Sequence, residues 1–85
     1  MRVNTRKAFE AFMGRKAAKP ADSIWSDGDR LWSYRTVIAE HQADGSVLLN
    51  VRKYSTTTAI HQNALRAAFQ QAGVVITEHI LPIAA

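Results

Sequence analysis

The first stretch with a helical period of hydrophobic positions lies near the start of the chain. Its apolar side chains recur at three- and four-residue spacing, at Ala8, Phe9, Phe12 and Met13. This spacing predicts an amphipathic helix from about residue 5 to residue 18, with its apolar stripe facing a core. Pro20 is expected to end the helix, because a proline pushes the residue before it out of the α region.

A second helix is predicted from about residue 56 to residue 72. It begins in a run of four hydroxyl residues, where Ser55 or Thr56 is expected to cap the helix by accepting a hydrogen bond from a free amide. Gln62 is predicted to lie on the outer face, and Gly73 suits the position just past the helix end. The predicted inner stripe consists of His61, Leu65, Phe69 and Ala72.

Between and after the helices, the pattern is typical of strands. A short strand is predicted at 23–26, followed by a turn at Asp27-Gly28-Asp29, because Asp-Gly tolerates the positive φ values of tight hairpins. Longer strands are predicted at 30–41 and 47–54. The β-branched stretch at about 74–81 predicts the last strand.

The predicted order is therefore α-β-β-β-α-β, in a single small α+β domain over residues 1–85. We expect an antiparallel sheet, covering about residues 23–54 and the last strand, to pack against the two helices. A domain of this size without disulfides often gains stability by dimerising or by binding a partner. A homodimer is therefore an open alternative.

The charge is unevenly distributed along the chain. Residues 1–19 contain six lysines and arginines and one acidic residue, whereas residues 20–85 contain five basic and six acidic residues. Such asymmetry indicates contact with nucleic acid or with an acidic partner. A solvated helix face with no binding role explains the basic start equally well.

Composition limits the chemistry that the chain can perform. It contains no cysteine, which suits a reducing cytoplasm, and no apolar run approaches the roughly 20 residues of a membrane span. Its start lacks the apolar block of a secretory signal. The three histidines show no metal-binding spacing, and no nucleophile elbow or glycine-rich loop accompanies the serines. We therefore expect no catalytic residues, no metal, no cofactor and no membrane contact.

Three features remain as candidates for binding. The hydroxyl run at the start of the second helix can hold a phosphate, although an ordinary helix cap is the preferred interpretation. Aromatic residues on a sheet can stack on unpaired bases, and Trp25, beside a turn, is the one most expected to be exposed. The basic residues complete the predicted partner- or nucleic-acid-binding set: Arg2, Arg6, Lys7, Arg15, Lys16, Lys19, Trp25, Arg35, Arg52 and Lys53.

Two segments of the chain resemble a family of small uncharacterised proteins carried by phages, plasmids and prophages. That family shows a Ser-Tyr-x-Thr-x-Ile-Ala strand, matched by Ser33, Tyr34, Thr36, Ile38 and Ala39. A Tyr-Ser-x-Thr-Thr-x-x-His element follows, matched by Tyr54, Ser55, Thr57, Thr58 and His61. The resemblance covers about residues 31–66 and differs at Arg35, where the family usually has glycine. It implies a mobile-element origin and a place in the cytoplasm of the bacterial host.

Two binding functions follow as hypotheses. In the first, the protein is a non-enzymatic inhibitor of the anti-CRISPR type that docks on a host defence complex, with or without its nucleic acid. In the second, it is an accessory protein that binds nucleic acid directly through the basic first helix and the arginines of the sheet. The second hypothesis predicts weaker binding for Arg6→Glu combined with Lys7→Glu, and an affinity that falls steeply with salt.

Overall fold

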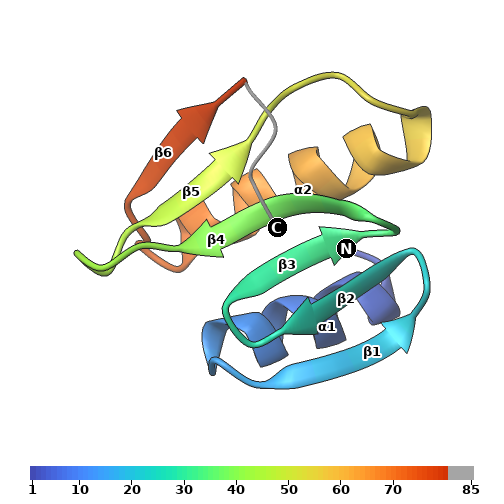
Figure 1. Ribbon diagram of the computed structural model, residues 1–85, viewed down its shortest axis with the longest axis horizontal. Helices are drawn as coiled ribbons and strands as arrows, with labels where there is room; N and C mark the ends of the chain where they lie inside the picture. Colours follow the sequence, from blue (N-terminus) through green and yellow to red (C-terminus); the bar gives the residue numbers. More distant parts are fainter. Residues whose placement is uncertain (81–85) are drawn as a thin grey trace.

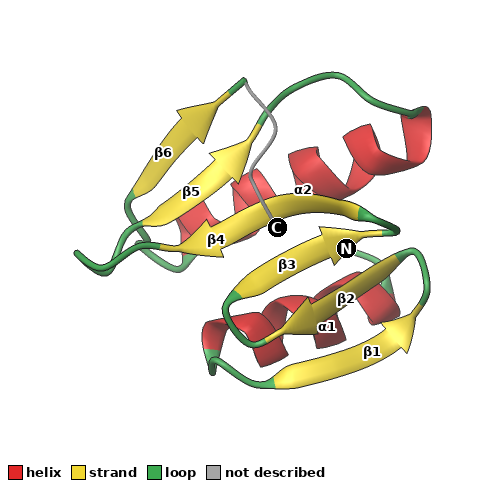
Figure 2. Cartoon of the chain, viewed as in Figure 1, coloured by secondary structure: helices red, strands yellow, loops and turns green. Residues whose placement is uncertain are grey.

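One sheet with both helices on the same face makes up the protein (Figures 1 and 2). The computed structural model describes residues 1–80. Its elements are α1 (Val3–Met13), β1 (Ala17–Ala21), β2 (Ile24–Asp27), β3 (Arg30–Ser33), β4 (Thr36–His41), β5 (Val47–Asn50), α2 (Thr56–Gln71) and β6 (Ile76–His79). The α+β class and the position of the two helices in the chain order are confirmed.

The six strands lie side by side in sequence order, from β1 at one edge to β6 at the other. Neighbours pair antiparallel from β1 to β5, whereas β6 runs parallel to β5. The prediction of a wholly antiparallel sheet is therefore wrong for the last pair. The reason is that α2 carries the chain back along the sheet, so β6 starts at the same end as β5.

The core lies between the sheet and the two helices. Phe12 of α1 and Phe69 of α2 meet edge to face, with ring centroids 5.9 Å apart, and both are completely buried. They pack on apolar residues from the same face of the sheet, among them Ile24, Leu31, Ile38, Val47 and Leu49. Within residues 1–80, no helix lies over the other face of the sheet, which we call the open face (Figure 1).

The first helix is shorter than predicted, because it ends at Met13 rather than near residue 18. Arg15 takes a positive φ of 54°, and the amide of Lys16 donates to the carbonyl of Ala11 (2.8 Å). This hydrogen bond is typical of a Schellman motif, in which a left-handed residue closes the helix. The chain then reverses, and Ala17–Ala21 form strand β1 instead of the predicted helix end.

Pro20 lies in this strand rather than after a helix. Because β1 is at the edge of the sheet, a residue without an amide hydrogen is tolerated there. The register of β1 on β2 also shifts between Ala18 and Ala21, which marks a bulge or irregularity. The sheet thus begins at residue 17, six residues before the predicted start.

The single strand predicted at 30–41 is in fact a hairpin. Tyr34 and Arg35 form the turn between β3 and β4, and Tyr34 has a positive φ of 54°. The turn was not predicted because neither residue is a usual turn former. The register also shifts after Leu31, so Trp32 pairs with Val37 and Ile38 becomes the extra residue. This split and β1 together explain why the sheet has two strands more than predicted.

The second helix largely follows the prediction. The hydroxyl of Ser55 accepts a hydrogen bond from the amide of Thr58 (3.2 Å), and Gly73 has a φ of 72° just past the helix end. Ala72, predicted inside, is exposed, whereas Gln62, predicted outside, is buried. The last strand ends at His79, and residue 81 of its predicted span lies outside the described residues.

Candidate functional site

A serine–histidine pair lies inside the protein, between β3 and α2. The hydroxyl of Ser33 is 2.9 Å from Nδ1 of His61 and 3.1 Å from the hydroxyl of Thr58. Ser55, the helix cap, donates to the same Thr58 oxygen (3.2 Å). These residues come from both motif segments, so the two segments are joined through one hydrogen-bond network.

This pair is unsuited to catalysis as it stands. Ser33 is 0% and His61 2% exposed, so neither reaches a substrate in solution. Burial lowers the pKa of His61, and the positive charge of Arg2 lowers it further, so the imidazole is neutral at neutral pH. Among the described residues, no carboxylate hydrogen-bonds to His61. These hydrogen bonds hold the start of α2 against β3 of the sheet.

Basic side chains gather at one end of the sheet, which we call the basic end. At this end β3 turns into β4, β5 finishes, and both helices begin (Figure 1). Its cations come from four different parts of the fold: Arg2, Lys19, Arg35, Arg52 and Lys53. The turns and loops at this end include one carboxylate within the described residues, Asp22, which lies 3.3 Å from Lys19. The two helix N-termini add positive potential to the same end.

The carboxylates lie mainly at the opposite end. Asp27 and Asp29 occupy the β2–β3 turn and Asp44 the β4–β5 turn. Burial alone would raise the pKa of Asp27, but hydrogen bonds from the Trp32 indole and from the amides of Arg30 and Asp29 outweigh it and lower the pKa. The two ends therefore differ in charge, although Arg15 and Lys16 also lie at this acidic end.

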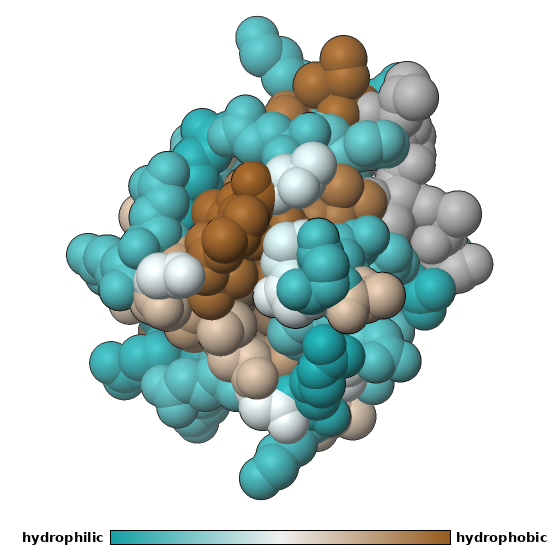
Figure 3. Space-filling view, turned by 90° about the vertical axis from the view of Figure 1, so that its left-hand side faces the viewer, coloured by the Kyte–Doolittle hydropathy of each residue, from teal (hydrophilic) through white to brown (hydrophobic). Residues whose placement is uncertain are grey.

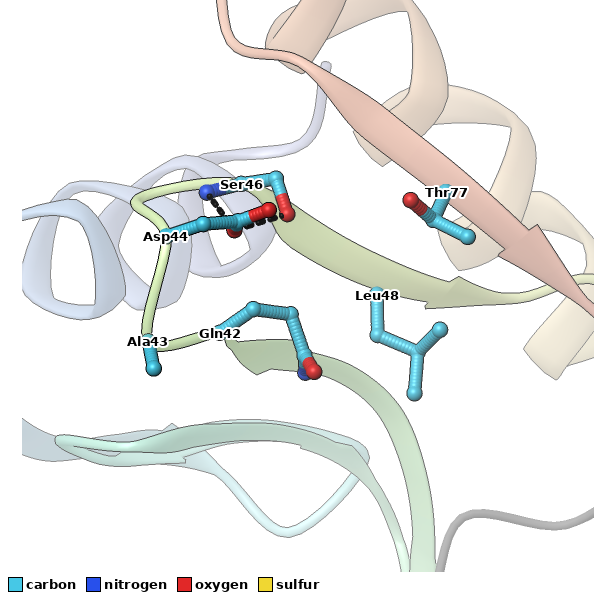
Figure 4. A pocket seen from close by; sticks show the side chains of 6 residues that line it. All are labelled: Gln42, Ala43, Asp44, Ser46, Leu48 and Thr77. Atoms are coloured by element: carbon cyan, nitrogen blue, oxygen red, sulfur yellow. Dashed lines mark hydrogen bonds between the residues drawn. The ribbon is translucent and has the colours of Figure 1, made fainter.

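A hollow of about 370 Å³ lies at this acidic end, on the open face of the sheet (Figure 4). The carboxylate of Asp44 accepts hydrogen bonds from the hydroxyl (2.6 Å) and the amide (2.9 Å) of Ser46. These bonds lower the pKa of Asp44. The Asp44 carboxylate is thus occupied by hydrogen bonds within its own turn. The other lining residues include Gln42, Leu48 and Thr77, and none of the residues that line this hollow is a cation.

A larger hollow, of about 680 Å³, lies at the basic end, and we call it the Trp25 hollow. Its lining residues come from β1, the turns and the neighbouring strand ends: Lys19, Asp22, Trp25, Tyr34, Arg35 and Thr36. Trp25 stacks on Trp32, with ring centroids 4.8 Å apart and an interplanar angle of 7°. The ammonium of Lys19 lies 5.4 Å from the Trp25 ring, within the range of a cation–π contact. This hollow combines aromatic surface with positive charge.

Two buried amides hold the loop that carries Arg52 and Lys53. The side chain of Asn50 donates to the carbonyl of Val37 (3.0 Å) and accepts from the amide of Arg52 (3.0 Å). The side chain of Gln62 donates to the carbonyls of Asn50 (2.8 Å) and Arg52 (2.9 Å). The loop has no regular structure, but these bonds fix its path between β5 and α2.

The predicted site residues separate into three groups. The basic end brings together six of them: Arg2, Lys19, Trp25, Arg35, Arg52 and Lys53. Arg15 and Lys16 lie at the acidic end, where Arg15 is 4.0 Å from Asp29. Arg6 and Lys7 are exposed on α1, which covers the other face of the sheet (Figure 1). The basic first helix and the Trp25 hollow are therefore different surfaces.

Three residues of this end were not in the predicted set. The sequence pattern predicts Tyr34 inside a strand, and only its position in a turn brings its ring to the hollow. Asn50 and Gln62 position the loop, although the pattern marks them only as polar residues of a strand and a helix. The signal for Asn50 was its place at a strand end, where asparagine often bonds to the backbone two residues on. Gln62 gave no such signal.

Other surfaces of the described residues show fewer features of a binding site. No group of three or more metal-binding side chains is found in residues 1–80, and no helix there is long and apolar enough to span a membrane. Figure 3 shows an apolar patch on the side where the β4–β5 turn lies. Val75, 70% exposed, precedes β6, which begins on this side. This patch is remote from the basic end.

One family model matches residues 2–79, which is nearly the whole chain, and it describes a family of unknown function (DUF8033). No curated protein and no solved structure matches the chain.

Proposed function

The chain belongs to the DUF8033 family, and because that family has no known function, we propose one from the chain itself. We propose that it is a non-enzymatic binding protein of a mobile genetic element. It acts as an inhibitor of the anti-CRISPR type, which docks through its basic end on a host defence complex in the bacterial cytoplasm. The class of partner rests on the resemblance of the two motif segments to phage and plasmid proteins.

One observation carries the proposal, namely the unpaired cations of the basic end. Arg2, Arg35, Arg52 and Lys53 form no ion pair within the described residues, whereas elsewhere Arg30 pairs with Glu40 at 2.9 Å. Cations without an internal partner leave their potential available to a negatively charged surface. Proteins and nucleic acids of a defence complex both present such surfaces.

The aromatic residues of the Trp25 hollow support the same surface. Tryptophan, tyrosine and arginine are the residue types that most often dominate binding energy at interfaces. Trp25, Tyr34 and Arg35 line one hollow within the basic end. The burial of the Ser33–His61 pair supports the non-enzymatic part of the proposal, because that pair has no access to a substrate.

The alternative is direct nucleic-acid binding through the basic first helix and the arginines of the sheet, of which the first helix is the part that the basic end does not include. It is favoured by the exposure of Arg6 and Lys7 on the outer face of α1. Arg6, however, lies 3.9 Å from Glu10 one turn later, which reduces its potential. Because α1 and the Trp25 hollow lie on different faces, charge reversal on each surface separates the two functions.

The test is capture of defence effector subunits by the tagged full-length protein, together with an interference assay in cells. We expect capture by the wild type and at least about tenfold weaker capture by Arg35→Glu combined with Arg52→Glu, because reversal of two charges opposes an acidic partner. The matched control, Arg6→Glu combined with Lys7→Glu, makes the same charge change on the other face and is expected to retain capture.

Two outcomes would count against the proposal. Absence of any captured defence protein, together with undiminished interference in cells, would refute docking on a defence complex. Loss of binding in the control variant alone would move the binding surface to the first helix.

A further inference from the structure

Tyr34 holds a backbone conformation that does not suit its residue type. It is the first residue of the two-residue turn between β3 and β4, and its φ is 54°. Glycine occupies such positions without strain, whereas a side chain clashes with the following carbonyl. Strained residues of this kind cluster at ligand sites. The strain at residue 34 therefore suggests that the Tyr34 side chain is kept for binding a ligand.

The turn is held in place by its neighbour on β2. The indole nitrogen of Trp25 donates to the carbonyl of Tyr34 (2.9 Å), and Trp25 itself is stacked against Trp32. This contact fixes the backbone of Tyr34 through its carbonyl and makes no use of its side chain. A glycine at residue 34 would keep the same hydrogen bond.

The ring of Tyr34 makes no polar or aromatic contact within the described part of the fold. It is 51% exposed, and within residues 1–80 its phenol has no hydrogen bond and its ring no aromatic contact. It lines the Trp25 hollow beside Arg35 and beside Lys19, whose ammonium lies 3.3 Å from the Asp22 carboxylate in the same hollow. An exposed aromatic ring next to Arg35, which forms no ion pair within the described residues, is a surface on which a planar anionic ligand can stack.

We infer that the Trp25 hollow binds single-stranded nucleic acid, with an unpaired base stacked on Tyr34 and the adjoining phosphates beside Arg35 and Lys19. Stacking on tyrosine requires an unpaired base, so a duplex fits less well. Aromatic platforms combined with basic side chains are typical of proteins that bind single strands. An acidic peptide would use the cations but would leave the Tyr34 ring without a partner.

Arg52 and Lys53 extend the site along the same end of the sheet. Their loop is held by Asn50 and Gln62, so both cations are presented from a fixed backbone. The inference rests on the proposed function in that both use the basic end, and it names nucleic acid as the ligand at that end.

The experiment is a fluorescence anisotropy titration of a labelled 12-nucleotide oligothymidine with the full-length protein. We expect binding whose logarithm of affinity falls linearly with the logarithm of salt concentration, and weaker binding to a duplex of the same length. Tyr34→Gly is expected to bind about 5- to 150-fold more weakly, because that is the range that loss of one stacked base produces. Tyr34→Phe keeps the ring and is expected to bind like the wild type.

Two further measurements show whether weaker binding comes from the lost ligand contact, from unfolding of the variant or from the change in charge. Thermal unfolding of Tyr34→Gly is expected at an unchanged or higher midpoint, because glycine relieves the strain at residue 34. Arg35→Gln is expected to reduce the salt slope by about 0.7, the value for one lost phosphate contact on a single strand. Lys7→Gln makes the same charge change on the opposite face and is expected to leave the slope unchanged.

The inference is overturned if the wild type does not bind the oligonucleotide, or if Tyr34→Gly binds it equally well. Effector capture after nuclease treatment distinguishes this result from failure of the proposed function. If effector subunits are captured but the oligonucleotide does not bind, the ligand of the basic end is protein. That outcome refutes the inference and leaves the proposed function standing. Oligonucleotide binding that depends on Tyr34, without capture of any effector and with undiminished interference in cells, supports the inference and refutes docking on a defence complex.

Discussion

The hydroxyl of Ser33 lies 2.9 Å from Nδ1 of His61, although 28 residues separate the two in the sequence. Ser33 belongs to the Ser-Tyr-x-Thr segment and His61 to the Tyr-Ser-x-Thr-Thr-x-x-His segment. Thr58 completes the contact at 3.1 Å from the same hydroxyl. The two motif segments therefore meet in one buried contact between β3 and α2. Its serine and histidine stabilise the packing of α2 on the sheet.

Removal of the Ser33 hydroxyl tests this contact. Ser33→Ala leaves the buried Nδ1 of His61 without its hydrogen-bond partner, while Thr58 keeps its bond to Ser55, so we expect a loss of about 1–3 kcal/mol in the free energy of unfolding. Urea denaturation measures it. Ser23→Ala, in the β1–β2 turn, is the matched control and is expected to change the free energy by less than about 0.5 kcal/mol. Equal effects of the two substitutions would contradict a structural role for the pair.

Stability should depend on pH through His61. Burial and the charge of Arg2 lower its pKa in the folded state, so the unfolded chain binds a proton first as the pH falls. The contribution of neutral His61 is complete above about pH 6.5, the ordinary histidine value, and is lost below it, at up to about 1.4 kcal/mol per pH unit. Unfolding by urea at pH 7 and pH 5 measures this loss.

His61→Gln provides the comparison for this pH effect. Its stability is expected to change less between pH 7 and pH 5 than that of the wild type, whatever its absolute value. Asp27 and Asp44 also have lowered pKa values, but their contributions are lost only below about pH 4, outside this interval. The same slope in both proteins would show that His61 is not the group that titrates.

Arg15 offers a stabilising substitution. Its φ of 54° closes the first helix, a position where glycine is unstrained. Arg15→Gly is expected to raise the free energy of unfolding by about 0.5–1 kcal/mol, after subtraction of the greater chain entropy of glycine. Arg15→Ala removes the same exposed ion pair with Asp29 but keeps the strain. If thermal unfolding finds the glycine variant no more stable than the alanine variant, the strain at residue 15 is negligible.

Gln62 should control the loop that presents Arg52 and Lys53. Gln62→Leu leaves the carbonyls of Asn50 and Arg52 without their donor, with an expected cost of about 1–3 kcal/mol. The freed loop is expected to be cut faster by trypsin after Arg52 and Lys53. Cleavage after Arg66, inside α2, serves as the internal reference. Uniform acceleration at both places would indicate global destabilisation rather than release of the loop.

Local chemistry made α2 predictable. Ser55 satisfies a free amide at the helix start, Gly73 adopts the left-handed conformation past its end, and Leu65 and Phe69 recur on one face. Each of these signals lies within a few residues of its effect. The same holds for the Asp27-Gly28-Asp29 turn, where Gly28 has a φ of 102°.

The errors arose where the deciding contact is distant. The helix end at Met13 is the exception, because it is set locally by a left-handed arginine, a residue type that does not usually close a helix. Strand β1, in contrast, exists because Ala17–Ala21 pair with β2. The turn at Tyr34 and Arg35 contains no glycine, asparagine or proline, and it is held by the indole of Trp25 nine residues earlier. No local pattern reveals such contacts.

The sequence by itself determined the α+β class, the capped second helix, the hairpin turn at Gly28 and the surplus of positive charge. These follow from spacing, capping and turn chemistry, which act between near neighbours in the chain. Only the tertiary structure decided which cations share a surface, because strand pairing and the direction of each turn set that. It divided the ten predicted binding residues among three surfaces, placed Lys19, Trp25 and Arg35 around one hollow, and brought the ring of Tyr34 there.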